Sequence, residues 1–380
     1  MSRAVTDEQR ALVDETRAFL AGIEPVVASE DLDERFAALV AYEQKLHAAG
    51  LAVVSWPERY GGRGLGPVEA AIVSEELGLG GAPETINFIA LEVVAPALFR
   101  FASEEQLDRW LPAMPGADEV WCQLFSEPDA GSDLASLATR AVRDGDDWVV
   151  NGQKVWSTWG QYSHKALLLA RTGTAESRHR GIAAFVMDVD TPGVEVRPLR
   201  TMTGEAEFAE VFLSDVRIPD ADMVGGEADG WGVAMEMLAG ERGPYAVRRA
   251  SVVRATLEGV YAAARERGVD PLTRDEITLA AIDLHVLDRQ IDRVVDALAS
   301  GESMGPAAAM TKALLTKADQ SVHAVAQKVL GPAGVAWSGG MHPWTDGFLY
   351  SRASSIYGGT AEIQRNIIGE RLLGLPREPN

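Results

Sequence analysis

The sequence predicts an α+β fold in three successive parts: a helical part (1–118), a central antiparallel β-domain (119–226) and a helical bundle (227–380). In the first and third parts, apolar residues recur at intervals of three and four, which gives a helix one apolar face. In the middle part, short β-rich runs alternate with Gly, Pro, Asn and Asp. The 380 residues, 47% of them hydrophobic, suffice for two or three domains with sizeable cores.

The first part is expected to be helical. Thr6-Asp7-Glu8-Gln9 is a capping start for an amphipathic run through Leu20, and 36–46 and 68–77 have similar spacing. The stretch 56–62 breaks the helices. The glycines of 62–66 do not complete a G-x-G-x-x-G motif and follow no strand, so a turn is a better interpretation than a dinucleotide loop.

The middle part is expected to consist of short strands. Asp144-Gly145 and Asn151-Gly152 are hairpin signals on either side of a run at 148–150. Further strands are expected at 166–170, 181–189, 194–199 and 208–213.

The third part is again expected to be helical. One long helix is predicted from about 231 to 267, followed by helices at 274–298, 306–330 and 361–373. Pro244 should bend the long helix, because it cannot donate to the carbonyl of Gly240.

Charge and composition exclude several kinds of partner. The net charge of -21 argues against nucleic acid and anionic membranes, which would be repelled over most of the surface. The single Cys122 excludes an internal disulfide and a thiolate metal cluster, and the six histidines lack metal-ligand spacing. No apolar run is long enough for a bilayer and the start is unlike a signal peptide, so we expect a cytoplasmic protein.

Four motifs carry the functional interpretation. They are Gln123-Leu124-Phe125-Ser126-Glu127-Pro128-Asp129-Ala130-Gly131-Ser132-Asp133, Lys154-Val155-Trp156-Ser157-Thr158, the turn 327–334, and the segment 355–368 with Tyr357-Gly358-Gly359-Thr360. The first three have ordinary explanations: a strand ending in a turn, a strand Trp in core or cross-strand packing, and a helix closed by Gly331. In this order they resemble the acyl-CoA dehydrogenase family, and the resemblance covers about residues 5 to 375.

The resemblance implies a bound FAD. It assigns flavin contacts to seven residues of the middle part, with Gly131 and Ser132 near the phosphates and the acyl-CoA. These residues are Gln123, Phe125, Ser126, Gly131, Ser132, Trp156 and Thr158. It also assigns flavin contacts to Thr360 and Glu362, and gives Gln327 and Gly331 contacts with the adenine half of a neighbouring subunit's flavin.

The catalytic base requires a separate argument, because many family members carry a Glu where this chain has Gly358. Some members with Ala or Gly there, the isovaleryl- and long-chain-type enzymes, take the base from the long helix, one residue before an Arg. Glu241, followed by Arg242, aligns with that position. Apolar neighbours on its helical face, with Tyr245 four residues on, would raise its pKa and strengthen it as a base. The alternative is an ordinary solvated helix Glu.

The resemblance implies α,β-dehydrogenation of an acyl-CoA or carrier-bound acyl thioester. Glu241 would be the base, the Gly358 N–H would stabilise the carbonyl, and Arg242 and Tyr245, with Ser132, would contact the substrate. Electrons would pass to an electron-transfer flavoprotein.

The family's Arg-x-Phe-Gly element is absent from 265–274, which leaves a homo-oligomer and a hetero-oligomer with a homologous subunit both open. The alternatives are a flavin oxidase or monooxygenase on this fold, or a non-catalytic subunit.

Overall fold

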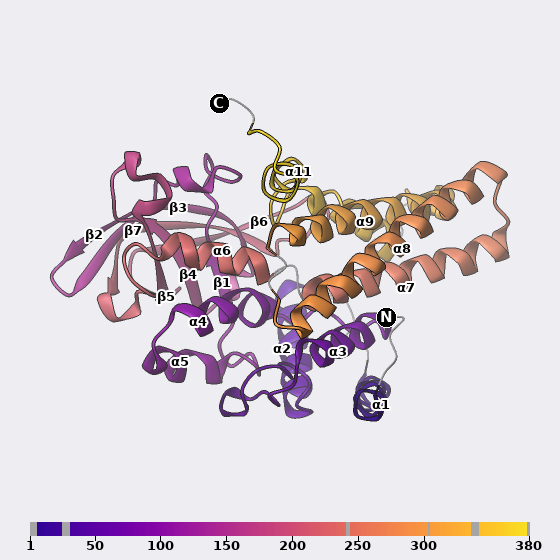
Figure 1. Ribbon diagram of the computed structural model, residues 1–380, viewed down its shortest axis with the longest axis horizontal. Coiled ribbons are helices and arrows are strands. Elements are labelled where there is room, and N and C mark those ends of the chain that lie inside the picture. The colour runs from indigo at the N-terminus through magenta and orange to yellow at the C-terminus, as the bar shows by residue number, and fades with distance from the viewer. Residues whose placement is uncertain (1–5, 25–30, 241–243, 303–304, 336–341, 378–380) are drawn as a thin grey trace. The chain divides into compact units, whose positions relative to one another are not determined.

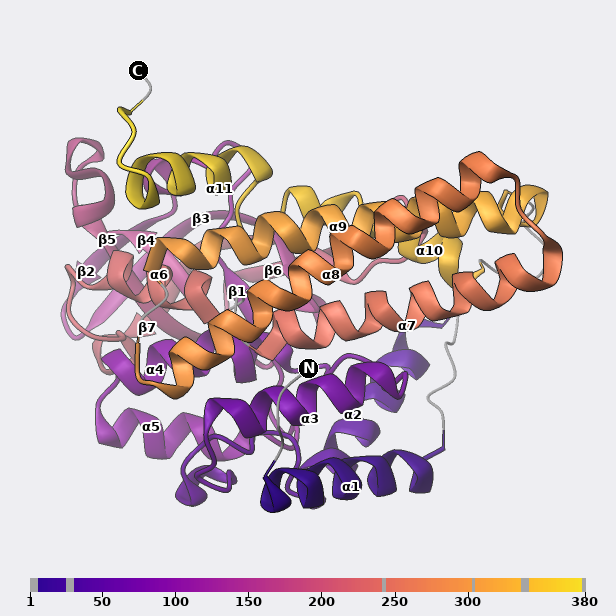
Figure 2. The ribbon, with the colours of Figure 1, turned by 45° about the vertical axis from the view of Figure 1, so that its right-hand side comes forward.

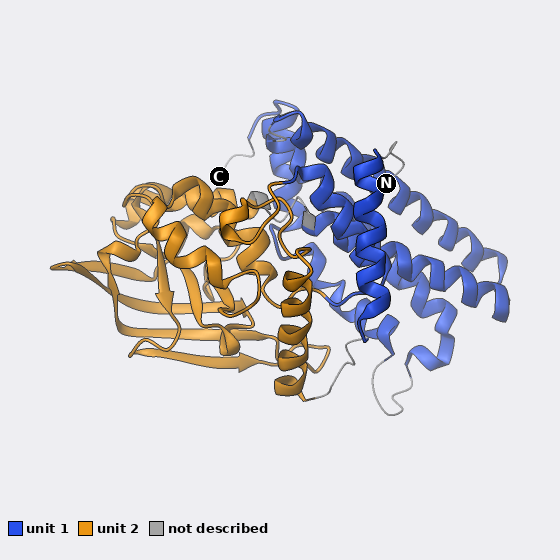
Figure 3. Cartoon of the chain, turned by 90° about the horizontal axis from the view of Figure 1, so that it is seen from below, with its two compact units in different colours: residues 1–25, 65–83, 241–380 blue, residues 26–64, 84–240 orange. Residues whose placement is uncertain are grey.

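The computed structural model describes residues 6–24, 31–240, 244–302, 305–335 and 342–377. The chain forms two compact units (Figure 3). Unit 1 comprises 1–25, 65–83 and 241–380, and unit 2 comprises 26–64 and 84–240. The order of helices and strands confirms the α+β fold class, whereas the boundaries predicted near 118 and 226 stay predictions.

Unit 2 is built on one seven-stranded sheet (Figure 1). Its strands are β1 (Trp121–Leu124), β2 (Arg140–Asp144), β3 (Asp147–Thr158), β4 (Lys165–Arg171), β5 (Ile182–Asp188), β6 (Val194–Leu199) and β7 (Phe208–Pro219). The order is β1-β4-β2-β3-β7-β6, with β5 paired to β4. Most pairs are antiparallel as predicted, but β1 and β2 pair with β4 in parallel, which the turn signals did not reveal.

The two predicted hairpin signals have different outcomes. Asp144-Gly145 is the turn between β2 and β3, and Gly145 has a φ of 66°. The hairpin at Asn151-Gly152 was wrong, because β3 runs through both residues with a register shift against β7. A Cβ on Gly152 would lie 2.3 Å from Thr139 Oγ1, so the glycine permits close packing.

The sheet is buried on both faces at its centre. Alternate residues of β4 enter two different cores: Leu167 and Leu169 pack with the helices, and Leu168 packs with Phe185 and Val211. The helices of unit 2 are α2 (Leu32–Ala48), α4 (Ala95–Phe101), α5 (Glu104–Trp110) and α6 (Gly230–Gly240). This double burial explains the continuous apolar runs of β4 and β5.

Unit 1 is helical. Its elements are α1 (Asp7–Gly22), α3 (Pro67–Leu79), α7 (Pro244–Arg267), α8 (Pro271–Ala299), α9 (Ala308–Leu330), α10 (Pro343–Tyr350) and α11 (Ala361–Ile367). Figure 2 shows α7, α8 and α9 side by side, and one apolar core with Leu257, Leu287 and Val322 joins them. The predicted capping box at Thr6 is present at the start of α1.

The long helix predicted from about 231 to 267 corresponds to α6 and α7. Its continuity across 241–243 lies outside the described residues. No helix in the described part of the chain is long and apolar enough to cross a membrane.

Candidate functional site

The predicted site residues belong to both units, and each group is described within its own unit. Unit 2 holds those from Gln123 to Thr158, and unit 1 holds Tyr245 and those from Gln327 to Glu362. Glu241 and Arg242 lie outside the described residues.

In unit 2 the loop after β1 is joined to the end of β3. The backbone N–H of Val155 donates to the carbonyl of Ser126 at 2.9 Å. The following turn closes with hydrogen bonds between the backbones of Glu127 and Ala130 at 3.0 and 3.1 Å. Two motifs that are about thirty residues apart in the sequence therefore lie side by side.

Trp156 sits at a β-bulge that directs its ring to solvent. The register of β3 against β7 shifts between Lys154 and Ser157, and Trp156 has a φ of 65°. Its side chain is 59% exposed and meets Phe208 edge-on, with ring centroids 6.1 Å apart. A left-handed conformation in a bulky residue costs roughly 1–2 kcal/mol. Of the two ordinary interpretations, packing in the core is therefore wrong, whereas cross-strand packing is present in the contact with Phe208 of β7. The exposed part of the ring can stack on a ligand.

A buried ion pair supports this loop, and sequence reasoning missed it. Lys154 is fully buried, and its Nζ donates to Glu127 at 2.8 Å and to the Phe125 carbonyl at 3.0 Å. The backbone N–H groups of Ala138 and Thr139 also donate to the Glu127 carboxylate, at 2.6 and 2.9 Å. The pair therefore fixes the backbone on both sides of Ser126.

The pKa values of the pair follow from burial and charge. Burial lowers the pKa of Lys154 to about 8, although Glu127 favours the charged ammonium. Burial alone would raise the pKa of Glu127, but Lys154 and the surrounding hydrogen bonds outweigh it and hold this pKa below its ordinary value.

The other predicted residues of unit 2 lie in this loop or in the strands β1 and β3. Phe125 is buried, Gly131 and Ser132 are exposed, and Thr158 is half-buried. The Oε1 of Gln123 is buried and has no hydrogen-bond partner among the described residues. An exposed aromatic ring, an unpaired amide oxygen and open glycine backbone fit a flavin, which needs ring contacts and polar contacts together.

In unit 1 the predicted carbonyl-binding turn has a left-handed backbone. Gly358 and Gly359 have φ of 62° and 90°. Gln364 Nε2 donates to the Gly358 carbonyl at 2.9 Å, and a Cβ on Gly359 would lie 2.5 Å from that nitrogen. The N–H of Gly358 has no acceptor within the described parts of the chain. This N–H is available to a ligand.

The remaining predicted residues of unit 1 have local roles. The hydroxyl of Thr360 accepts from the Ile363 N–H and caps α11, and Glu362 is exposed, 3.8 Å from Arg365. Gly331 ends α9, as the ordinary interpretation expected. Gln327 Nε2 donates to Thr345 Oγ1 at 2.9 Å. Their flavin contacts stay predictions.

Tyr245 belongs to a group that we call the tyrosine–arginine cluster: Tyr245, Arg249, Asp319, Tyr350 and Tyr357. The hydroxyl oxygens of Tyr245 and Tyr357 are 3.5 Å apart. Arg249 Nη2 donates to both carboxylate oxygens of Asp319, at 3.0 and 3.1 Å. The structure thus joins a predicted substrate residue to the residue that precedes Gly358.

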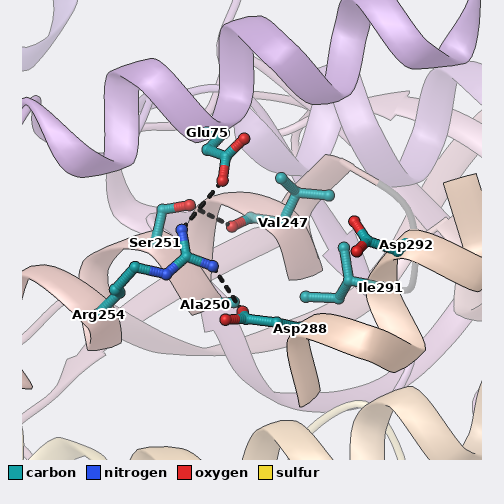
Figure 4. Close-up of a pocket in the computed structure, with 8 residues that line it drawn as sticks. All are labelled: Glu75, Val247, Ala250, Ser251, Arg254, Asp288, Ile291 and Asp292. Carbon is teal, nitrogen blue, oxygen red and sulfur yellow. Dashed lines mark hydrogen bonds and ion pairs between the residues drawn. The ribbon is translucent and has the colours of Figure 1, made fainter. Parts of the chain in front are cut away.

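Two other features of unit 1 do not contribute to this site. Where the Arg-x-Phe-Gly element is absent, Arg267 Nη1 donates to the Val329 carbonyl at 3.1 Å, at the end of α9. A separate cavity between α3, α7 and α8 contains Arg254, which bonds Glu75 at 3.0 Å and Asp288 at 2.5 Å (Figure 4). No predicted site residue lines that cavity.

Family models account for most of the chain. The model for the acyl-CoA dehydrogenase N-terminal domain matches residues 6–117, that for the middle domain 122–216, and that for the C-terminal domain 228–373. The chain belongs to the acyl-CoA dehydrogenase family, whose members are FAD-dependent oxidoreductases.

Individual relatives support the same family assignment. Acyl-CoA dehydrogenase IpdE1 of Mycobacterium tuberculosis is 41% identical over 355 residues, which are 91% of this chain and 90% of that protein. The solved structure of the Tcur3481-Tcur3483 steroid ACAD is 27% identical with a TM-score of 0.88, over 100% of both chains. The ChsE4-ChsE5 complex from Mycobacterium tuberculosis is 29% identical with a TM-score of 0.85, again over 100% of both chains. The resemblance inferred from the four motifs is confirmed.

Proposed function

We propose that this chain binds FAD and converts an acyl-CoA, or a carrier-bound acyl thioester, into its trans-2-enoyl thioester. The proton leaves Cα to Glu241, and the hydrogen on Cβ leaves with its electron pair. FAD, when bound, supplies the acceptor for that electron pair. The proposed flavin contacts are those of the loop after β1, of Trp156 and Thr158, and of Thr360 and Glu362.

The observation that supports this proposal most is the N–H of Gly358, which has no acceptor in the described part of the chain. An α-proton becomes removable only when the charge growing on the thioester carbonyl is stabilised. A fixed N–H does this without reorganisation, and Gln364 holds the adjacent Gly358–Gly359 peptide unit through the Gly358 carbonyl. A Gly at this position keeps the donor while the base comes from elsewhere.

The backbone at Gly358 also bears on where the base can be. Its φ of 62° would cost a side chain roughly 1–2 kcal/mol. A carboxylate carried on residue 358 would therefore be strained in this chain, which favours a base on another element. Glu241 is our proposal for that base, and Arg242 and Ser132 are proposed to order the substrate.

Glu241→Gln tests the proposal. This substitution keeps the size of the side chain and removes the proton acceptor, so reduction of the flavin by an acyl-CoA should slow by about 10²–10⁴-fold. Anaerobic stopped-flow bleaching of the flavin measures this rate, and the FAD content should equal that of the wild type. Glu236→Gln is the matched control, because Glu236 lies on α6 and pairs with Arg100.

The outcomes separate the alternatives. A near wild-type rate in Glu241→Gln would show that the base is another group. Fast turnover with oxygen alone would identify an oxidase. A flavin that no acyl-CoA bleaches would indicate a non-catalytic subunit.

We also propose an oligomer with a second copy or a homologous chain, and an electron-transfer flavoprotein as acceptor. The ChsE4-ChsE5 complex supports assembly with a homologous chain. Light scattering of the FAD-loaded, active protein tests this, and an active monomer would contradict it.

A further inference from the structure

The tyrosine–arginine cluster contains a buried donor without a partner. Arg249 directs Nη2 to both oxygens of Asp319, whose Oδ1 also lies 3.1 Å from His323 Nδ1. The guanidinium lies over the Tyr350 ring, 5.6 Å from its centroid. Its Nε is buried and has no hydrogen-bond partner among the residues that the structure describes.

A second arginine of the same helix shows what a purely structural pair looks like. Arg254, five residues further along α7, donates hydrogen bonds from its guanidinium to two carboxylates, those of Glu75 and Asp288. No atom of Arg254 is buried without a partner. Because a buried donor without an acceptor is costly, the difference between the two arginines indicates that Arg249 faces a group that the described residues do not provide.

The cluster adjoins both proposed catalytic groups in the sequence. Tyr245 follows Glu241 by four residues, and Tyr357 immediately precedes Gly358. The two tyrosine hydroxyls meet at 3.5 Å, and both rings are half-buried. In the proposed function the thioester carbonyl is bound at Gly358. Because Tyr357 directly precedes Gly358, part of the acyl group of that thioester would come close to these hydroxyls.

We propose that Arg249, Tyr245 and Tyr357 bind an oxygen atom on the acyl group, so that the substrate is an oxygenated acyl thioester. This inference rests on the proposed function. The oxygen is neutral, that of a ketone or a hydroxyl, because Asp319 already compensates the charge of Arg249. A carboxylate would place a second negative charge beside the fully buried Asp319. A plain hydrocarbon chain would leave the Arg249 Nε without an acceptor.

Matched substrates test the proposal. We would compare decanoyl-CoA with oxodecanoyl-CoAs whose keto oxygen is moved from the fifth to the ninth carbon, and with decanedioyl-CoA. A cyclohexylpropanoyl-CoA and its ring ketone provide a second scaffold. In anaerobic flavin reduction, the best ketone should exceed its hydrocarbon parent by roughly 10–100-fold in kcat/KM, and the dicarboxylate should be poorer than the ketone.

Variants connect that preference to the cluster. Tyr245→Phe and Tyr357→Phe each remove one hydroxyl and should lower kcat/KM for the best ketone by about 3–10-fold, mainly through KM, with a smaller change for the hydrocarbon. Tyr261→Phe, on the same helix, is the matched control and should change neither. The double variant Arg249→Met/Asp319→Leu removes the pair without leaving a buried charge and should abolish the preference for ketones.

A wild type that prefers hydrocarbons on both scaffolds would overturn the proposal, as would an unchanged preference in the double variant. If the double variant does not fold, the two tyrosine variants decide, and unchanged selectivity in both overturns the proposal. These results differ from failure of the proposed function itself, in which no acyl-CoA of either kind would bleach the flavin.

Discussion

Two buried ion pairs in this molecule have the same chemistry and different surroundings. In unit 2, Lys154 and Glu127 use their donors and acceptors on each other and on the Phe125, Ala138 and Thr139 backbones. In unit 1, Arg249 and Asp319 are also joined directly, but the Arg249 Nε has no partner among the residues that the structure describes. Each buried side-chain nitrogen and oxygen of the first pair has at least one partner among the described residues, and we call this pair saturated. The second pair is unsaturated in that sense.

This difference in hydrogen bonding suggests different roles for the two ion pairs: the first supports the backbone, and the second is proposed to contact a ligand. A saturated pair holds backbone in one conformation, and here it holds the loop that contains Ser126 and the part of β3 that contains Trp156. An unsaturated pair costs free energy until a ligand supplies the missing acceptor. Breaking the first pair should therefore damage stability and cofactor retention, and breaking the second should change substrate selection.

Lys154→Met should have the largest effect. It leaves the Glu127 carboxylate buried without its counter-charge, which typically costs 3–5 kcal/mol. We expect the free energy of unfolding to fall by about that amount and FAD to be lost on gel filtration. Urea unfolding and the flavin absorbance of the eluted protein measure the two effects.

The control for this variant is Lys165→Met, because Lys165 pairs with the exposed Asp188 on the same sheet. That substitution should cost about 1 kcal/mol or less. Lys154→Met/Glu127→Gln should recover part of the loss, because no charge is left buried. Equal stability of Lys154→Met and Lys165→Met would contradict the supporting role of the buried pair.

Acid should weaken the second pair by a smaller amount. Burial would raise the pKa of Asp319, but Arg249 and His323 outweigh it and lower this pKa from 3.8 to about 2. The carboxylate therefore contributes stability above pH 3.8 that is lost as the pH falls toward 2. The amount is about 2 kcal/mol, of which about half is lost by pH 3.

Asp319→Asn provides the reference for that measurement, because it cannot titrate. The gap in unfolding free energy between wild type and variant should narrow by about 1 kcal/mol from pH 5 to pH 3. A gap that stays constant over this range would mean that Asp319 is not ionised beside Arg249.

The sequence predicted local features better than contacts between segments that are far apart in the chain. The capping box at Thr6 and the turn at Asp144-Gly145 depend on neighbouring residues, and both were predicted. Asn151-Gly152 has the same local signal, but its glycine permits a close contact with Thr139, which directly precedes β2. Neighbouring residues alone therefore do not show whether an Asn-Gly or Asp-Gly pair forms a turn or an irregularity within a strand. Packing against a segment distant in the sequence determines which of the two forms.

The candidate site divides in the same way. The motifs predicted Ser126, Trp156 and Gly358 as site residues, because the family's motifs follow one another in the same order in this sequence. The ion pairs were missed, since Lys154 and Glu127 are 27 residues apart and Arg249 and Asp319 are 70 apart. Every helix and strand carries charged residues, so only packing decides which of them are buried together.

The smallest expected effect tests the strain at Trp156, which the saturated pair holds in place. At a φ of 65°, alanine keeps the steric conflict and glycine does not. In the FAD-free protein, Trp156→Gly should therefore be more stable than Trp156→Ala by about 1 kcal/mol in urea unfolding. At Gln153, earlier in β3, the order should reverse, because glycine in a regular strand costs roughly 0.5–1 kcal/mol. Both Trp156 variants should bind FAD more weakly, since both lack the ring. If alanine is the more stable residue at 156, the bulge does not have this backbone conformation, and Trp156 is not held toward the ligand by strain.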